Sequence, residues 1–344
     1  MEENRAAMDD SKYDARLLMM EIGRYENDGQ QIGMNGTTAA NGGGDASAAK
    51  AKRPKLLWVH GWGMSPETWR HLAAELPALD HRYVSYASCR TIEELREVVS
   101  LPFRLEPEGE WHAIGWSMGG MLLLEALAAW MAGPASPAMP AVRSIVFCGT
   151  TLRFIDDTGQ AGWPDRVVAR MRRRLAHAPE ETLRAFAECL PSAAERDDAG
   201  LRRVLAQYRA RTACSAHAPM AAAQPASPES GVHAFTPEGL DAGLAYLQQA
   251  DLAAAWARVT AAPAGPRLLW LHGADDTVCP LGAVKRAQAL NGQRNAARFA
   301  VLPQAGHVPF LTQPARWRKE LTSWYDNDIG FNRDSASISG RERE

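Results

Sequence analysis

The chain has 344 residues, 46% of them hydrophobic, and a formal charge of -2 at pH 7. This composition suits a globular protein with a large core, and we expect one domain that carries an insertion. The near-zero charge gives no reason to expect a nucleic-acid partner, and no run of about eighteen apolar residues is present to span a membrane. Because the first residues also lack the basic region and apolar core of a signal peptide, the sequence predicts a cytoplasmic protein.

Five cysteines are present, an odd number without a C-x-x-C pair, which predicts reduced thiols rather than a disulfide framework or a zinc site. They are Cys89, Cys148, Cys189, Cys214 and Cys279. Residues 1–53 are predicted to be a disordered extension, because residues 27–52 are rich in Gly, Asn, Ala and Ser with little to bury. An apolar patch at residues 17–22 leaves an edge strand or a short helix open there, and residues 327–344 are predicted to be a disordered tail.

The first ordered element is an apolar run, residues 56–61, which is typical of a buried parallel strand. The run ends in H-G-W-G, and a helix with Pro66 in its first turn follows. A loop in this place lies at the carboxyl edge of a sheet, so the backbone N–H of Trp62 is a candidate for binding an oxyanion. The alternative is an ordinary tight turn. Residues 83–87 are predicted to form the next strand, with a helix after it.

Ser117 stands between Gly115 and Gly119 in the sequence G-W-S-M-G, after an apolar run and before an apolar, helix-favouring segment. A strand, a tight turn and a helix around G-x-S-x-G predict a nucleophile elbow, in which the serine occupies a strained backbone position. The start of a helix leaves backbone N–H groups unpaired, so the N–H of Met118 is the second candidate for an oxyanion. The alternative is a chance match in a glycine-rich chain.

Residues 144–149 are predicted to form another buried strand, and the alternation of strands and helices predicts a parallel sheet with helices on both faces. The pattern then changes. Residues 164–175, 179–190 and 199–208 are predicted to be amphipathic helices, with a flexible loop at residues 215–231. We therefore expect a core of residues 54–150 and 260–326, interrupted by a helical insertion at residues 151–259.

The sheet is expected to resume with a strand at residues 268–272 and to end with a strand just before His307. Serine, acid and base then follow one another along the chain as Ser117, Asp276 and His307, each just after a strand. A serine hydroxyl needs a base to remove its proton, and a carboxylate orients the histidine ring and stabilises its cation.

The acid has competitors in the sequence. Asp276 is preferred to Asp275 as the acid because it stands three positions after Gly273 and ahead of a turn. Asp275 is expected to be a solvated or turn-capping neighbour. Asp156 and Asp157, after the preceding strand, are a second alternative.

The motifs H-G-W-G-M-S-P-E-T-W, G-W-S-M-G-G, G-W-P-D-R-V-V, G-A-D-D-T-V-C-P and A-G-H-V-P-F resemble the α/β-hydrolase superfamily from about Leu56 to Tyr325. Within it they are most similar to the pimeloyl-[acyl-carrier protein] methyl ester esterases of biotin synthesis. The resemblance implies an α/β-hydrolase fold, with a mostly parallel sheet flanked by helices and an inserted α-helical lid, and for a serine hydrolase of this kind we expect no metal or organic cofactor. It implies a triad of Ser117, Asp276 and His307, with oxyanion amides and substrate contacts at Trp62 and Met118. It also implies an acyl channel lined by Phe186, Ala187, Glu188, Cys189 and Leu190.

Two departures from the family pattern bear on the substrate. Y-A-S-C-R-T-I-E-E-L replaces the usual D-x-P-G-x-G-x-S loop, and the N-terminal extension is foreign to the esterase. We expect an ester hydrolase that works through an acyl-enzyme, with pimeloyl-carrier methyl ester as the leading substrate. A general carboxylesterase, a lactonase, a carbon–carbon bond hydrolase, an acyltransferase and a non-catalytic binding protein on the same fold are the alternatives.

The insertion is rich in arginine. One cluster is Arg166, Arg170, Arg172, Arg173 and Arg174, and a second is Arg202, Arg203, Arg209 and Arg211. Arginine binds phosphates and carboxylates through paired hydrogen bonds, so such a face could dock an acidic acyl-carrier protein. The alternative, an ordinary solvated helix surface, is the preferred interpretation of this pattern.

Overall fold

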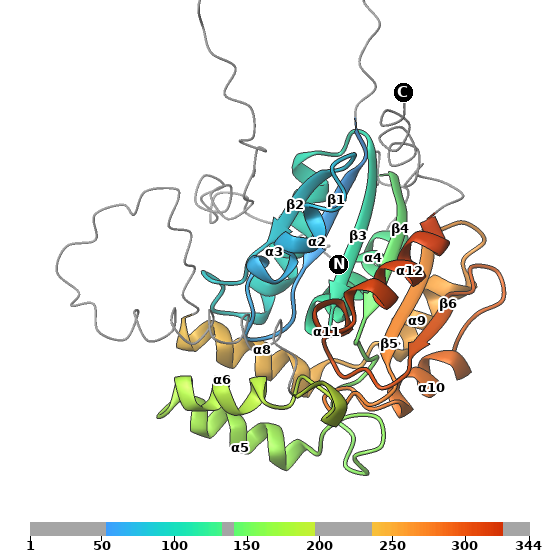
Figure 1. Cartoon of the computed structure of the whole chain (residues 1–344). Coiled ribbons are helices and arrows are strands. Elements are labelled where there is room, and N and C mark those ends of the chain that lie inside the picture. The colour runs from blue at the N-terminus through green and yellow to red at the C-terminus, as the bar shows by residue number, and fades with distance from the viewer. Residues whose placement is uncertain (1–52, 133–140, 197–235, 326–344) are drawn as a thin grey trace, which may run out of the picture.

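The computed structural model describes residues 53–132, 141–196 and 236–325. Six strands in these ranges form one sheet in the order β2-β1-β3-β4-β5-β6, and every neighbouring pair is parallel (Figure 1). The strands are β1 Lys55–Val59, β2 Asp80–Val84, β3 Glu110–Trp116, β4 Ala141–Cys148, β5 Arg267–Gly273 and β6 Arg298–Leu302. The predicted α/β fold with a parallel sheet is confirmed.

The position of β2 differs from the prediction, which placed this strand at residues 83–87. The strand starts three residues earlier and ends at Val84. Its first residues are polar and only partly buried, which an edge strand tolerates, because among the described strands β2 has a neighbour on one side only. Beyond the strand the backbone turns, because the Ala87 N–H bonds to the Ser85 hydroxyl and the Cys89 N–H bonds to the Tyr86 carbonyl.

Helices cover both faces of the sheet, because successive residues of a strand point to opposite sides. Gly115 faces α4 Met118–Ala132, which packs between α3 Ile92–Leu105 and α9 Ala253–Ala261. The next residue, Trp116, points the other way and packs against Trp69 of η2 Pro66–Trp69 and Phe310 of α11 Pro309–Thr312. Short α2 Arg70–Ala73 and α12 Pro314–Tyr325 lie on this second face (Figure 1), and α10 Gly282–Ala289 follows β5.

The helical insertion leaves the sheet after β4 and includes α5 Asp165–Leu175, α6 Pro179–Ala187, η3 Ala193–Glu195 and α8 Pro237–Gln249. Figure 1 shows α5, α6 and α8 grouped together below the sheet. The first two helices occupy the predicted segments, whereas residues 199–208 and 215–231 lie outside the described ranges. Trp256 of α9 packs against Phe147 and Trp270 of the sheet, so this helix covers the core, although the expected boundary placed most of it in the insertion.

The four cysteines within the described ranges form no disulfide with one another, and Cys214 lies outside those ranges. Burial raises the pKa of the Cys148 thiol to about 12 and raises that of Cys279 well above its ordinary value. Both therefore remain neutral thiols near pH 7. No helix in the part of the chain that the structure describes has the length and apolarity needed to cross a membrane.

Candidate active site

Ser117 lies on the tight turn between β3 and α4, and its φ of 54° is in the left-handed region, which non-glycine residues rarely adopt. The strained position expected for this serine is confirmed. The neighbouring glycines permit the turn: a Cβ on Gly115 would lie 2.7 Å from the Cα of Gly120, and a Cβ on Gly119 would lie 2.6 Å from the carbonyl oxygen of Val59. Only glycine allows the strand and the helix to approach so closely.

The H-G-W-G loop after β1 borders the serine. A Cβ on Gly61 would lie 3.1 Å from the Cβ of Ser117. The adjacent residue Trp62 is 2% exposed, and its indole N–H donates to the carbonyl oxygen of Leu240 at 2.8 Å, which fixes the loop against α8. Met118 is the first residue of α4, so its backbone N–H has no acceptor within that helix. The two candidate oxyanion amides therefore come from segments that meet at Ser117.

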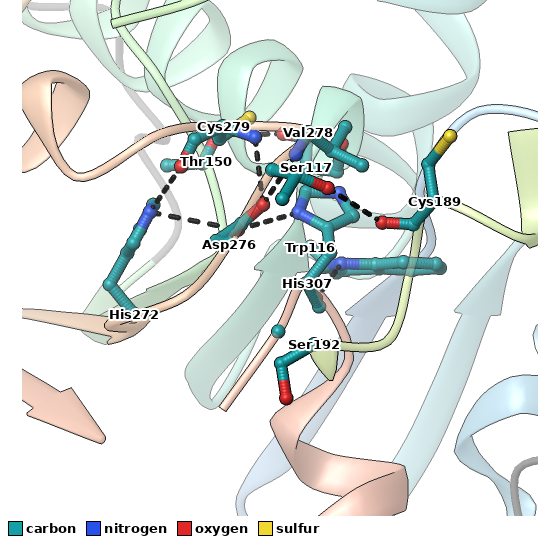
Figure 2. A network of polar contacts seen from close by, with 12 residues as sticks. Trp116, Ser117, Thr150, Cys189, Ser192, His272, Asp276, Val278, Cys279 and His307 are labelled. Atoms are coloured by element: carbon teal, nitrogen blue, oxygen red, sulfur yellow. Dashed lines mark hydrogen bonds and ion pairs between the residues drawn. The ribbon is translucent and has the colours of Figure 1, made fainter. Parts of the chain in front are cut away.

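Asp276 and His307 form a buried pair. The Nδ1 atom of His307 lies 2.7 Å from Oδ2 of Asp276, and both side chains are fully buried (Figure 2). The other carboxylate oxygen accepts the backbone N–H groups of Val278 and Cys279, each at 2.8 Å. These bonds fix the orientation of the carboxylate, so Oδ2 faces the imidazole. Asp275 is exposed, as expected for the solvated neighbour.

The alternative aspartates hold a loop instead. The carboxylate of Asp156 accepts the N–H of Ala161 at 2.7 Å, and that of Asp157 accepts the N–H of Asp165 at 3.1 Å, at the start of α5. The carboxylate that bonds to His307 is that of Asp276 and not that of Asp156 or Asp157. These two carboxylates instead stabilise the segment that leads into the insertion.

The imidazole of His307 is oriented with one nitrogen available. Since Nδ1 points at a carboxylate, it carries the proton, and Nε2 is the acceptor nitrogen. Nε2 is buried and bonds to no other described residue. The backbone is held on both sides, because the indole of Trp116 donates to the His307 carbonyl at 2.9 Å and the His307 N–H donates to the carbonyl of Leu190 at 2.7 Å. Since Trp116 directly precedes Ser117, the serine and histidine segments are in contact.

Sequence reasoning missed two polar residues of the site. His272 lies 3.6 Å from Asp276, and its Nε2 donates to the carbonyl of Cys279 at 2.7 Å. Burial lowers the pKa of His272 below its ordinary value, against an opposing effect of Asp276. The hydroxyl of Thr150 donates to the carbonyl of Ser117 at 2.7 Å. A histidine directly before Gly273 was a visible signal, but a threonine two residues after a strand has no distinctive pattern.

The segment expected to line an acyl channel, residues 186–190, contacts the site through Phe186 and Leu190. Phe186 packs edge-on against the ring of Trp62, with 5.0 Å between centroids. Ala187 and Leu190 are buried, Cys189 is half-buried and Glu188 is exposed. Glu188 is the C-cap of α6 and its side chain is exposed, and a channel lined by these five residues stays a prediction.

A model of the alpha/beta hydrolase family matches residues 56–320, and the chain belongs to this family. Two curated relatives are each named pimeloyl-[acyl-carrier protein] methyl ester esterase. The one from Nitrosomonas europaea is 27% identical over 281 residues, covering 77% of this chain and 92% of the relative. The one from Aromatoleum aromaticum is 28% identical over 277 residues, covering 76% and 94%.

Solved structures show the same fold. An esterase from Exiguobacterium antarcticum superposes with a TM-score of 0.60 at 16% identity, covering 80% of this chain and 92% of that chain. A bromoperoxidase from Bacillus anthracis gives a TM-score of 0.59 at 14% identity, with the same coverage. At these identities the likeness concerns the fold alone, since one fold serves many reactions.

Proposed function

We propose that the protein is a serine hydrolase that cleaves a carboxylic ester through an acyl-enzyme. The observation that carries the proposal is the buried pair of Asp276 and His307. The Nε2 atom of His307 has no hydrogen-bond partner among the described residues, and the backbone of His307 accepts a bond from Trp116 in the nucleophile elbow. A neutral imidazole with a free acceptor nitrogen is the group that a serine hydroxyl needs as a base.

The proposed reaction follows from these positions. As Oγ of Ser117 attacks the ester carbonyl, Nε2 of His307 takes its proton, and Asp276 stabilises the resulting imidazolium. The backbone N–H groups of Trp62 and Met118 bind the oxyanion of the tetrahedral intermediate. The imidazolium then protonates the leaving alcohol. Water, activated by the same base, releases the acid and restores the serine.

The finer proposal is the substrate, a methyl ester of an acyl chain carried by an acyl-carrier protein. Both curated relatives carry that activity in their names, and each is covered over more than nine tenths of its length. The buried aromatic contact of Trp62 with Phe186 provides an apolar wall next to the proposed oxyanion site, which suits an acyl chain.

The arginines of α5 fall into two groups, and this division supports carrier docking. Arg172 pairs with Asp241 and Arg174 pairs with Glu181, so these two hold the insertion together. Arg166, Arg170 and Arg173 are exposed and form no ion pair with another described residue. Their spacing of four and three residues puts them on one face of the helix, where they could contact an acidic partner.

Replacement of Ser117 by Ala tests the chemistry. Because the nucleophile is removed from a turn without loss of core packing, turnover of any ester that the wild type cleaves should fall by roughly 10⁴ or more while the fold is retained. Product release and circular dichroism measure the two effects. The exposed Ser323→Ala is the control, and wild-type turnover in Ser117→Ala would refute the proposal.

A triple change of Arg166, Arg170 and Arg173 to Ser tests the partner. Docking through this face should make the variant lose kcat/KM on a carrier-bound methyl ester, most strongly at low salt, because salt screens exposed charges. The same free methyl ester, without the carrier, provides the control substrate. Equal effects on both substrates would leave the three arginines as ordinary surface and the hydrolase proposal intact.

A further inference from the structure

Glu195, at the end of η3, is a buried carboxylate to which the proposed reaction gives no role. It is 7% exposed and accepts four hydrogen bonds. One oxygen accepts the backbone N–H groups of Ser192 at 2.9 Å and Gly306 at 2.8 Å. The other accepts the hydroxyl of Thr312 at 2.7 Å and the side-chain amide of Gln313 at 3.0 Å. A carboxylate can accept all four, so each donor is satisfied.

The donors come from both sides of the candidate base. Gly306 directly precedes His307 in the chain, whereas Thr312 and Gln313 follow it at the end of α11. Ser192 belongs to the helical insertion. Glu195 therefore joins the insertion to the segment that presents the imidazole.

Other contacts show how tightly this segment is enclosed. A Cβ on Gly306 would lie 2.4 Å from the backbone nitrogen of Ser192, and a Cβ on Gly273 would lie 2.1 Å from the carbonyl oxygen of Gly306. The Ser192 hydroxyl donates at 2.8 Å to the carbonyl of Gln304, whose φ of 62° is in the left-handed region. The backbone at Gly306 is in direct contact with Ser192 on one side and Gly273 on the other. A shift of either neighbour should therefore displace Gly306, because a packed interior transmits displacement.

We propose that Glu195 is a positioning residue, which sets the place of His307 relative to Ser117 through its bond to the Gly306 N–H. This inference rests on the proposed function. Glu195 touches no reacting atom, and its effect is geometric: it couples the helical insertion to the base. A displacement of about 1 Å in a reacting group can lower a rate by roughly 10²-fold, so loss of this carboxylate should act on the chemical step.

The test compares Glu195→Ala with Glu195→Gln. Alanine leaves the Gly306 N–H without an acceptor. Glutamine keeps one oxygen for the two backbone N–H groups, and its amide can donate to the Thr312 hydroxyl and to a flipped Gln313 side chain. Glu180→Ala, which removes an exposed carboxylate of α6, is the matched control.

Each protein is assayed on p-nitrophenyl acetate well below its melting temperature, and Ser117 labelling by a fluorophosphonate is timed separately. We expect Glu195→Ala to lower kcat by tenfold or more, with KM within about twofold, and to slow labelling in parallel. Glu195→Gln should recover kcat to within about threefold of the wild type. Wild-type kcat and labelling rate in Glu195→Ala, or a change confined to KM, would overturn the inference.

Two further variants keep the outcome decisive. If Glu195→Ala does not fold, Thr312→Val, which removes one donor but keeps the side-chain shape, should lower kcat a few-fold at unchanged KM, and an unchanged kcat would count against positioning. Ser117→Ala distinguishes a failure of the proposed function from a failure of the role of Glu195. An active Ser117→Ala refutes the proposed function, whereas an inactive Ser117→Ala beside a fully active Glu195→Ala refutes only the role of Glu195.

Discussion

Asp275 and Asp276 are adjacent but have opposite environments, since the first is exposed and the second is buried against His307. In Asp276→Asn, a side-chain NH₂ group would face either the imidazole N–H or the N–H groups of Val278 and Cys279. The first arrangement keeps both backbone bonds but makes Nδ1 the acceptor, which is the wrong histidine tautomer, and the second places donors against donors; kcat should therefore fall by roughly 10³ to 10⁴. Asp275→Asn makes the same chemical change next door and should keep kcat within about twofold. Similar losses in both variants would show that Asp276 is not the acid.

His272 gives a pH dependence of stability. Its pKa is lowered by burial, so below its ordinary value of 6.5 the unfolded chain binds a proton that the folded chain does not. The free energy of unfolding should therefore decrease as the pH falls from 6.5 towards the folded pKa, by up to about 1.4 kcal/mol per pH unit. The charged and titratable groups that affect this ring are Asp276 and His307.

His272→Gln removes this titration and keeps a donor for the Cys279 carbonyl. Urea unfolding at pH 7.5 and pH 5.5 should show a smaller loss of stability at the lower pH in the variant than in the wild type. His81, whose pKa burial also lowers, is present in both proteins, so its effect cancels in the comparison. The same loss in both proteins would mean that His272 takes up its proton equally well in the folded state.

At the scale of elements, α5 and α8 are joined by Arg172, which bonds to both carboxylate oxygens of Asp241 at 2.7 Å and to the side chain of Gln248 at 3.0 Å. The pair is partly exposed, so its net contribution should not exceed about 1 kcal/mol. Arg172→Ala should nevertheless loosen the insertion locally. We expect faster cleavage of this region by a protease than in Arg184→Ala, which removes an exposed arginine of α6, and equal cleavage rates would contradict the role.

Most elements that carry the site were predictable because their signals are local. Apolar runs that end in glycine marked β1, β3 and β5, and three- and four-residue periodicity marked α5 and α6. The start of β2 was missed because Asp80, His81 and Arg82 lack a strand pattern, and pairing with β1 is what makes them a strand. The placement of α9 against the sheet depends on where Trp256 packs, which periodicity does not specify.

At the scale of the molecule, the candidate site is assembled from segments that are distant in sequence. The loop after β1, the elbow after β3 and the loops after β5 and β6 meet at the carboxyl edge of the sheet, as parallel topology requires. This convergence is why three candidate residues could be named from the sequence. Ser192 and Glu195 form a capping box, which is a local pattern, but the proposed role of Glu195 was beyond such reasoning because its bond to Gly306 spans 111 residues.

The central claim, an acyl-enzyme on Ser117, can be measured directly. The protein is mixed with a slowly turned-over p-nitrophenyl ester, quenched in acid at short times, digested and mapped by mass spectrometry. We expect the acyl mass on the peptide that contains Ser117, formed at the rate of the p-nitrophenol burst and absent from Ser117→Ala. Turnover of the ester without an adduct on that peptide, or an adduct on another residue that forms at the same rate, would contradict the account.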